Sequence, residues 1–186
     1  RHYYVICADA GYETAMKAGI KPDLVVGDFD SAKEPPPKEI KCVSLPVDKD
    51  VTDTMFAVMK GFNLGLHSFL LLGCLGGKRF VHSLANLEVL QYIREHGGHG
   101  IMAGDHTKIF LLQEERLKMT GMAGAIVSVF PYNGSNCIVS YSGLKYPLNR
   151  GQLSCGGLPM GVSNQVTGDP AEVRVHSGCA LVVVGQ

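Results

Sequence analysis

The sequence predicts a fold in two parts, an α/β part followed by an all-β part. Up to about Leu112, short apolar runs alternate with segments of helical periodicity. After Gln113 the helical signal disappears, and short β-like runs are separated by Gly, Asn and Pro. We therefore expect an N-terminal, mostly parallel α/β sheet with helices on both faces, followed by a C-terminal antiparallel β-sandwich.

The first part divides into five strands and three helices. Its strands are expected at 3–8, 24–26, 42–45, 68–72 and 109–112, and its helices at 12–18, 52–64 and 83–95. Thr52 is a suitable N-cap for the second helix because its hydroxyl can accept a backbone N–H. In the third helix the apolar residues recur every three positions, which predicts a single apolar face made of Leu84, Leu87, Leu90 and Ile93.

The second part contains only short strands. Turn signals at 131–134 and 167–170 punctuate it, as is typical of a small antiparallel sandwich or barrel. Its strands are expected at 117–119, 125–130, 137–141, 144–147, 162–166, 172–175 and 181–184. The change in pattern between Gln113 and Thr120 places one domain at 1–114 and a second at 115–186.

Composition excludes several classes of function. The 17 Lys and Arg balance 17 Asp and Glu, so the basic surplus of a nucleic-acid binder or of a polybasic membrane protein is missing. The chain is 46% hydrophobic, which is enough for a sizeable core, and its longest apolar run is far shorter than the roughly 20 residues that span a bilayer. The six widely spaced cysteines contain no Cys-x-x-Cys pair, which favours reduced thiols in a cytoplasmic protein.

Acidic side chains follow three successive strands of the predicted parallel sheet. Asp9 ends the first strand, Asp28 and Asp30 follow the second, and Asp50 and Asp53 come between the third strand and its helix. Ligands of such sheets bind beyond the carboxyl ends of the strands, and converging carboxylates need a cation. Any one of these residues could be only a turn former or cap. The set of Asp28, Asp30 and Asp53 predicts a metal site, and oxygen ligands favour Mg²⁺.

A glycine-rich basic loop follows the next strand, at 73–80. Gly76 and Gly77 would let backbone N–H groups approach a phosphate, which Lys78 and Arg79 would neutralise. The loop is not a Walker A motif, and by itself it could be an ordinary turn. On the same sheet edge as the acidic cluster, it predicts a polyphosphate site. His82 and Asn86 follow, and we interpret His82 as a hydrogen-bonding or orienting group.

Several motifs together resemble one known family. They are Ala8-Asp9, Gly27-Asp28-Phe29-Asp30-Ser31, Lys49-Asp50-Val51-Thr52-Asp53, Gly76-Gly77 with 79–86, 143–148 and Gly161-Val162-Ser163-Asn164. In order and spacing they resemble thiamine pyrophosphokinase over nearly the whole chain. The Gly-Asp-Phe-Asp-Ser motif followed by a Thr-Asp helix start is the most specific of these motifs.

The resemblance implies a homodimer that transfers the pyrophosphoryl group of ATP to the thiamine hydroxyl and releases AMP. It implies that catalysis depends on Asp28, Asp30, Asp50, Asp53 and Arg79, with Asp28, Asp30 and Asp53 holding Mg²⁺. The residues implied on the ATP side are Asp9, Lys49, Gly76, Gly77, Lys78, His82 and Asn86. The residues implied on the thiamine side, at the domain and subunit junction, are Ser163, Asn164 and Tyr146.

Departures from the family pattern leave alternatives open. The family usually has Asp before the position of His82, where this chain has Val81, and Ala10 stands where a second Gly is usual. One alternative is a metal-dependent phosphohydrolase that uses the same aspartates to activate water. The other is a degenerate thiamine- or nucleotide-binding protein without turnover.

Overall fold

The computed structural model describes residues 3–28, 35–44, 50–76, 80–159 and 161–185. The chain forms two compact units, each built from two segments. Unit 1 contains residues 1–69 and 79–99, and unit 2 contains residues 70–78 and 100–186. Each unit has its own core, and the two are described in turn.

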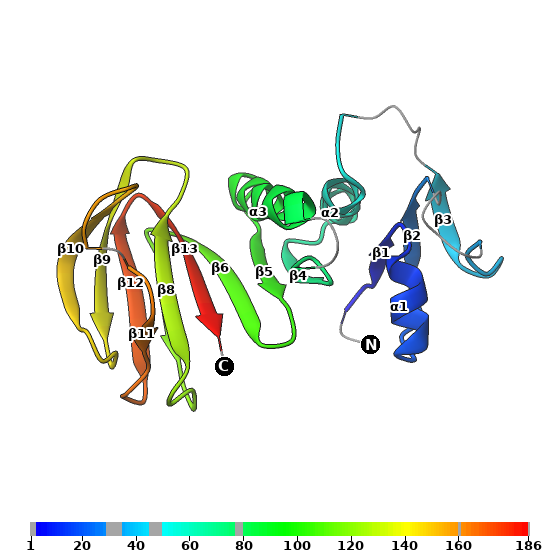
Figure 1. Ribbon diagram of the computed structural model, residues 1–186. Helices are drawn as coiled ribbons and strands as arrows, with labels where there is room; N and C mark the ends of the chain where they lie inside the picture. The colour runs from blue at the N-terminus through cyan, green and yellow to red at the C-terminus, as the bar shows by residue number, and fades with distance from the viewer. Residues whose placement is uncertain (1–2, 29–34, 45–49, 77–79, 160, 186) are drawn as a thin grey trace. The chain divides into compact units, whose positions relative to one another are not determined.

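Unit 1 contains a three-stranded parallel sheet (Figure 1). Its strands are β1 (Ile6–Ala8), β2 (Leu24–Gly27) and β3 (Lys41–Ser44), in the spatial order β1-β2-β3. The register pairs Ala8 with Val26, and Gly27 with Ser44. All three strands therefore end at the same edge of the sheet, as the predicted parallel arrangement requires.

Two helices pack on opposite faces of this sheet. Helix α1 (Gly11–Lys17) buries Tyr12 against a cluster that contains Cys7 and Val25. Helix α2 (Asp53–Asn63) buries Ala57 against Leu24 and Val26, which point to the other face because successive residues of a strand alternate. Helices on both faces of a parallel sheet are what the sequence predicts.

The third helix, α3 (Phe80–Glu95), begins three residues earlier than predicted and buries a different stripe. Its buried residues are Asn86, Val89, Leu90 and Ile93, whereas Leu84 is 49% exposed. A helix has about 3.6 residues per turn, so each step of three residues falls about 60° short of a full turn. The three steps from Leu84 to Ile93 therefore spread these side chains over about 180° of the helix surface. The predicted apolar face was therefore wrong at Leu84 and right at Leu90 and Ile93.

Unit 2 is built on two sheets (Figure 1). One sheet has the order β11-β8-β13-β6-β5-β4 and the other has the order β10-β9-β12-β7. The strands are β4 (Ser68–Leu72), β5 (His99–Ala103), β6 (Thr107–Gln113), β7 (Arg116–Met119), β8 (Ile126–Pro131), β9 (Asn136–Ser142), β10 (Leu148–Ser154), β11 (Asn164–Gln165), β12 (Ala171–Ser177) and β13 (Cys179–Gly185). One cluster of buried side chains, including Val129, Val139 and Val182, is drawn from both sheets, so the predicted sandwich is confirmed.

Two strands of unit 2 were not predicted, and one prediction was wrong. Strand β5 lies in a stretch that begins Gly97-Gly98-His99-Gly100, and its glycines suggest a turn. Strand β10 is polar and is interrupted by a register shift between Leu148 and Gly151. The segment 144–147 forms no strand; it contributes a single bridge between Leu144 and Val166. Backbone pairing with a neighbouring strand decides whether these segments form strands. The spacing of apolar residues in the sequence does not predict that pairing.

Among the helices in the described part of the chain, none combines the length and apolar character needed to cross a lipid bilayer. The six cysteines are free thiols; Cys7, Cys74, Cys137 and Cys179 are buried, and Cys42 and Cys155 are exposed. Burial raises the pKa of the Cys7, Cys74 and Cys137 thiols from 9.0 to about 11. At neutral pH these thiols are therefore protonated and unreactive.

The buried thiols predict a loss of stability in alkali. Because their pKa is higher in the folded state, their contribution is complete below pH 9.0 and is lost as the pH rises to about 11. Each buried thiol should lower the free energy of unfolding by up to about 1.4 kcal/mol per pH unit in this window. Urea unfolding at several pH values measures the slope. The variant Cys7→Ala should flatten this dependence on pH. The variant Ser177→Ala, at an exposed position without a thiol, should not. Equal slopes in both variants would contradict the prediction.

Candidate functional site

The carboxyl ends of β1 and β2 approach each other closely at the predicted site edge. The backbone N–H of Asp9 donates to the Val26 carbonyl at 2.7 Å, which extends the β1–β2 pairing by one residue. Asp9 has a φ of 45° and Gly27 a φ of 152°. A Cβ added at Gly27 would lie 3.0 Å from Asp9 Cα and 3.1 Å from Asp9 N. The Gly of the Gly-Asp-Phe-Asp-Ser motif is thus required by the backbone of Asp9.

Asp9 carries an unsatisfied carboxylate oxygen. Its Oδ1 atom is buried and has no hydrogen-bond partner among the described residues. A buried carboxylate oxygen without a partner is costly unless a cation or a donor of a ligand satisfies it. The donor chemistry at this edge therefore fits a hard cation such as Mg²⁺ or a hydrogen-bonding group of a nucleotide.

The other predicted acids are placed by the ends of β2 and α2. Asp28 directly follows β2, and Asp53 is the first residue of α2. Thr52 caps this helix as predicted, because its Oγ1 accepts from the Met55 N–H at 3.2 Å. Asp50 is exposed two residues before the cap. The helix N-terminus favours a negative charge at Asp53.

Part of the predicted site lies outside the described residues. Asp30, Lys49, Gly77, Lys78 and Arg79 belong to this group. Within the described ranges, no three His, Cys, Asp or Glu side chains gather closely enough to hold a metal ion. The Mg²⁺ set of Asp28, Asp30 and Asp53 therefore stays a prediction.

The start of α3 carries the remaining predicted residues of the ATP side. His82 is exposed, and Asn86, one turn later, is only 7% exposed. Val81, which stands where the family usually has Asp, is 65% exposed beside the exposed Phe80. Gly76 is a described residue of the preceding loop with a φ of 77°, a conformation that suits glycine.

In unit 2, the structure brings Tyr146, Ser163 and Asn164 together. Asn164 is 7% exposed, and its side-chain amide forms hydrogen bonds with the backbone of Tyr146. The Tyr146 N–H donates to Asn164 Oδ1 at 3.0 Å, and Asn164 Nδ2 donates to the Tyr146 carbonyl at 2.8 Å. The Oδ1 atom also accepts from the Gln165 N–H at 2.9 Å. Asn164 thus fixes the position of Tyr146 and keeps one N–H for another partner.

The neighbours of Asn164 are both accessible. Tyr146 is 61% exposed, and Lys145 Nζ lies 5.6 Å from the centre of its ring. Ser163 is exposed and has a φ of 57°, and its N–H donates to Ser128 Oγ at 3.1 Å. An exposed aromatic ring next to a hydroxyl and a fixed amide can stack on a planar ligand and form hydrogen bonds with it.

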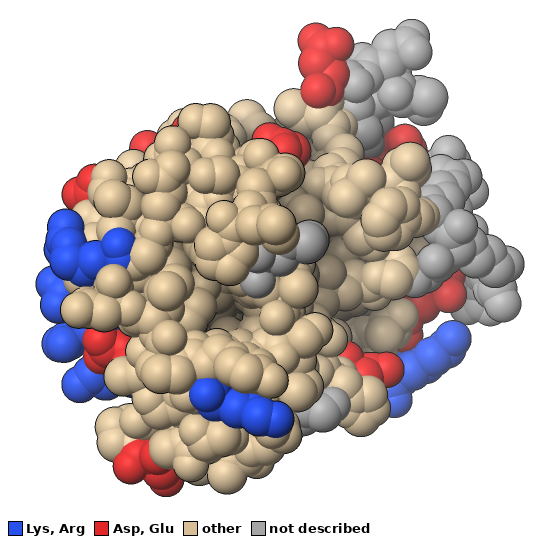
Figure 2. All heavy atoms as spheres, turned by 60° about the vertical axis from the view of Figure 1, so that its left-hand side comes forward, with Lys and Arg blue, Asp and Glu red and all other residues tan. Residues whose placement is uncertain are grey.

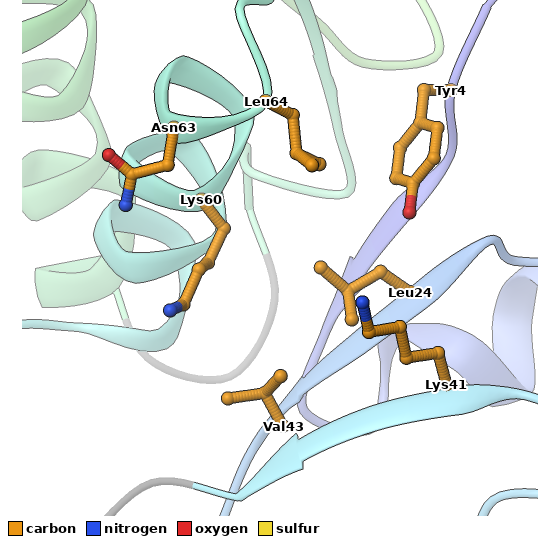
Figure 3. A pocket seen from close by; sticks show the side chains of 7 residues that line it. All are labelled: Tyr4, Leu24, Lys41, Val43, Lys60, Asn63 and Leu64. Carbon is orange, nitrogen blue, oxygen red and sulfur yellow. The ribbon is translucent and has the colours of Figure 1, made fainter.

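Sequence reasoning missed a pocket of about 230 Å³ in unit 1. It lies at the amino ends of the strands, the opposite end from Asp9 and Asp28, between the sheet and the last turn of α2 (Figure 3). Its lining residues are Tyr4, Leu24, Lys41, Val43, Lys60, Asn63 and Leu64. These residues come from β2, β3 and α2, with Tyr4 before β1 and Leu64 just after α2, so only the tertiary structure reveals the pocket.

Two family descriptions match the chain in sequence. The family described as thiamin pyrophosphokinase, catalytic domain, matches residues 1–101. The family described as thiamin pyrophosphokinase, vitamin B1 binding domain, matches residues 110–181. None of the curated proteins matches the chain in sequence.

Solved structures of similar fold cover the whole chain or nearly all of it. Thiamine pyrophosphokinase from Bacillus subtilis aligns with a TM-score of 0.88 at 21% identity, covering 100% of this chain and 89% of that one. Thiamin pyrophosphokinase from Geobacillus thermodenitrificans gives 0.85 at 20% identity, covering 100% and 87%. Thiamin pyrophosphokinase from Candida albicans gives 0.81 at 17% identity, covering 98% and 81%. These likenesses confirm the predicted fold class.

The close approach of Gly27 to Asp9 predicts the effect of a single methyl group. Gly27→Ala should lower the free energy of unfolding by about 1–3 kcal/mol, because the added Cβ meets the Asp9 backbone. Gly11→Ala is the matched control, since a Cβ there meets nothing within 4 Å. Chemical denaturation measures both variants. Equal stability of the two variants would show that the Asp9–Gly27 contact is not tight.

Proposed function

Because the chain belongs to the thiamin pyrophosphokinase family, we propose that it is an active thiamine diphosphokinase. In the proposed reaction the thiamine hydroxyl oxygen attacks the β-phosphorus of ATP. The bond from that phosphorus to the bridging α,β-oxygen breaks, AMP leaves, and the hydroxyl proton passes to a base. The presence of both family matches in order, each with its own predicted residues, carries this proposal.

The sheet edge of unit 1 is proposed as the phosphate side of the site. Pyrophosphoryl transfer depends on positioning and on neutralising charge, for which no covalent intermediate is needed. We assign Asp28, Asp30 and Asp53 as the residues that would hold Mg²⁺. The bound ion would supply charge neutralisation at the phosphates. The unsatisfied oxygen of Asp9 supports this edge as a place where a ligand or ion binds.

The remaining residues of the phosphate side keep their predicted roles. Lys49 and Arg79 would contact phosphate oxygens, and Lys78 with Gly76 and Gly77 would complete the loop around them. Asp50 would lie near the reacting groups, since it is close in sequence to Asp53. His82 and Asn86 would orient the nucleotide from the start of α3.

The cluster of Tyr146, Ser163 and Asn164 is proposed as the thiamine side. Tyr146 would stack on a ring of thiamine, and Ser163 would hydrogen-bond its pyrimidine. Asn164 would act partly through Tyr146, because most of its hydrogen-bonding capacity is spent on the Tyr146 backbone and on Gln165. One N–H of Asn164 would then be left for the pyrimidine.

Assembly and location complete the proposal. We propose that the 1–114 domain binds ATP, that the 115–186 domain binds thiamine, and that two copies associate as a homodimer around the thiamine site. A cytoplasmic location is proposed from the pattern of reduced cysteines. Size-exclusion chromatography with light scattering would test the dimer.

The decisive experiment incubates the full chain with ATP, Mg²⁺ and thiamine and separates the products. Thiamine diphosphate and AMP in equal amounts support the proposal. Consumption of ATP without thiamine, with release of ADP or inorganic phosphate, would instead indicate a phosphohydrolase. Saturable thiamine binding without any turnover would indicate a degenerate binding protein. That alternative is raised by Val81, which replaces the usual Asp of the family.

The metal assignment predicts that Asp28→Asn and Asp53→Asn lower kcat by about 100-fold or more, because the amide no longer binds the cation or offsets phosphate charge. Thermal unfolding should change little, since both residues lie at the ends of their elements. Asp105→Asn, an exposed position in unit 2, is the control and should keep full activity. Unchanged Mg²⁺-dependent activity in both site variants would reject the assignment.

The thiamine side predicts different effects for neighbouring residues. Ser163→Ala should raise KM for thiamine while leaving KM for ATP and the stability unchanged. Asn164→Ala should raise KM for thiamine and also lower the free energy of unfolding by about 1–3 kcal/mol, because the Tyr146 N–H and carbonyl lose their partner. Steady-state kinetics and urea unfolding separate the two effects. A change in KM for ATP in Ser163→Ala would contradict the division between the two sides.

A further inference from the structure

The outer face of the four-stranded sheet in unit 2 is strongly basic. Strands β7, β9, β10 and β12 turn alternate side chains away from the core, and these strands carry four Lys or Arg residues and one acid. The cations are Arg116, Lys118, Arg150 and Arg174, and the acid is Glu172. Figure 2, in which the left-hand side of Figure 1 comes forward, shows several Lys and Arg side chains at its left-hand margin, with a few acidic ones among them. The zero net charge of the chain hides this local surplus.

Two of the arginines face each other directly across neighbouring strands. Arg174 of β12 is the register partner of Arg116 of β7, and on its other side it is paired with Ser140 of β9. Within the described residues, neither the Arg116 nor the Arg174 side chain forms an ion pair, and Glu172 is instead the register partner of Lys118. Like charges directly opposite each other destabilise a sheet unless an anion lies between them.

The same row continues to Arg150 through a defined hydrogen-bond network. Arg150 Nη1 lies 3.2 Å from His176 Nδ1, and His176 Nε2 lies 2.8 Å from Ser140 Oγ. A guanidinium has only donors, so Nδ1 must accept and the ring proton must sit on Nε2, which donates to Ser140. The Arg150 backbone N–H also donates to Ser140 Oγ, at 2.9 Å. His176 is therefore neutral and orients the Arg150 guanidinium.

Several hydrogen-bond donors of this network have no acceptor within it. Both lone pairs of Ser140 Oγ are occupied, so its own O–H proton is available, and it has no acceptor among the described residues. The guanidinium groups of Arg150, Arg174 and Arg116 offer further N–H donors along the row. Arg150 adopts a φ of 48° at the register shift of β10, which commits the backbone to this arrangement. Donors without acceptors, arranged around the oriented guanidinium of Arg150, match an oxyanion.

We propose that the row of Arg116, Arg174, Ser140 and Arg150 on the outer face of this sheet binds a small anion that carries phosphoryl groups. The row crosses three strand spacings, or about 14 Å, so it has room for a diphosphate group as well as a single phosphate. The site is separate from the residues proposed for catalysis, none of which lies on β7, β9, β10 or β12. It does not depend on the proposed function.

The test is a titration of the full chain with inorganic pyrophosphate, in phosphate-free buffer with a chelator, followed by nuclear magnetic resonance of the histidine rings. The His176 ring signal, assigned with His176→Asn, reports this face and not the proposed phosphate side of unit 1. We expect a saturable shift of that signal. Arg174→Gln and Arg150→Gln should each weaken binding about tenfold. Lys108→Gln, an exposed position on β6, removes the same charge and should bind as the unmodified chain does.

A second readout is the pKa of His176. Partial burial and the guanidinium groups of Arg150 and Arg174 lower this pKa below its ordinary value of 6.5. The other charged groups of the face are Arg116 and Lys118 on β7 and Glu172 on β12. Bound pyrophosphate offsets the guanidinium charge, so it should raise the pKa of His176, and Arg174→Gln should raise it without any ligand. If the pKa of His176 changes neither with pyrophosphate nor in Arg174→Gln, the proposed hydrogen-bond network is wrong.

Three outcomes would overturn the proposal itself. The first is a His176 signal that sodium chloride at matched ionic strength shifts as much as pyrophosphate does. The second is equal weakening in Lys108→Gln, which would show that only total charge matters. The third is co-flotation of the protein with vesicles of phosphatidylcholine that contain phosphatidic acid, if this binding requires Arg174 and is not displaced by pyrophosphate. That result would assign the row to lipid headgroups.

Discussion

The close approach of Asp9 to Gly27 is the contact on which the candidate catalytic edge depends. Parallel pairing brings the ends of β1 and β2 to one edge, and the Asp9 N–H closes this pairing on the Val26 carbonyl. Gly27 has to lack a side chain there, because a Cβ would lie 3.0 Å from Asp9 Cα. The backbone thus holds two acidic residues, Asp9 and Asp28, at the ends of adjacent strands. Their like charges make a cation or a polar ligand the natural complement of this edge.

The two faces of the parallel sheet show how this edge is supported. Cys7 and Val25 pack under α1, while Leu24 and Val26 pack under α2. The second helix begins at Asp53, so the packing of Ala57 on the sheet also sets where the first turn of α2 lies. A packed core behind the loops that carry charged groups is the arrangement that holds such groups in defined positions.

In unit 2, polar side chains are used to fix backbone before any ligand is involved. Asn164 binds the backbone of Tyr146 on both its N–H and its carbonyl, and Ser140 accepts from Arg150 and His176. Each bond leaves fewer donors, and these are held in a better defined orientation. The groups that a ligand could bind near Asn164 and near Ser140 are therefore those not used in internal hydrogen bonds. They can be identified only after those internal bonds have been assigned.

Much of this protein could be predicted from the sequence because the signals are local. Short apolar runs and segments with helical periodicity predicted both parts of the fold class, and Thr52 predicted the start of α2. The order of Asp9, Asp28 and Asp53 along the chain placed three acids at strand or helix ends, since such ends need only local pattern and turn chemistry.

What the sequence could not determine depends on contacts between distant residues. Leu84 carries an apolar side chain but faces solvent, because packing on α2 decided which stripe of α3 is buried. Strand β10 exists through its pairing with β9, and the row from Arg116 to Arg150 exists through the register of four strands. By itself the sequence determined the fold class and the family, and it predicted candidate residues for the chemistry. The tertiary structure alone decided which of them meet, because strand register brings together residues that are far apart in the chain.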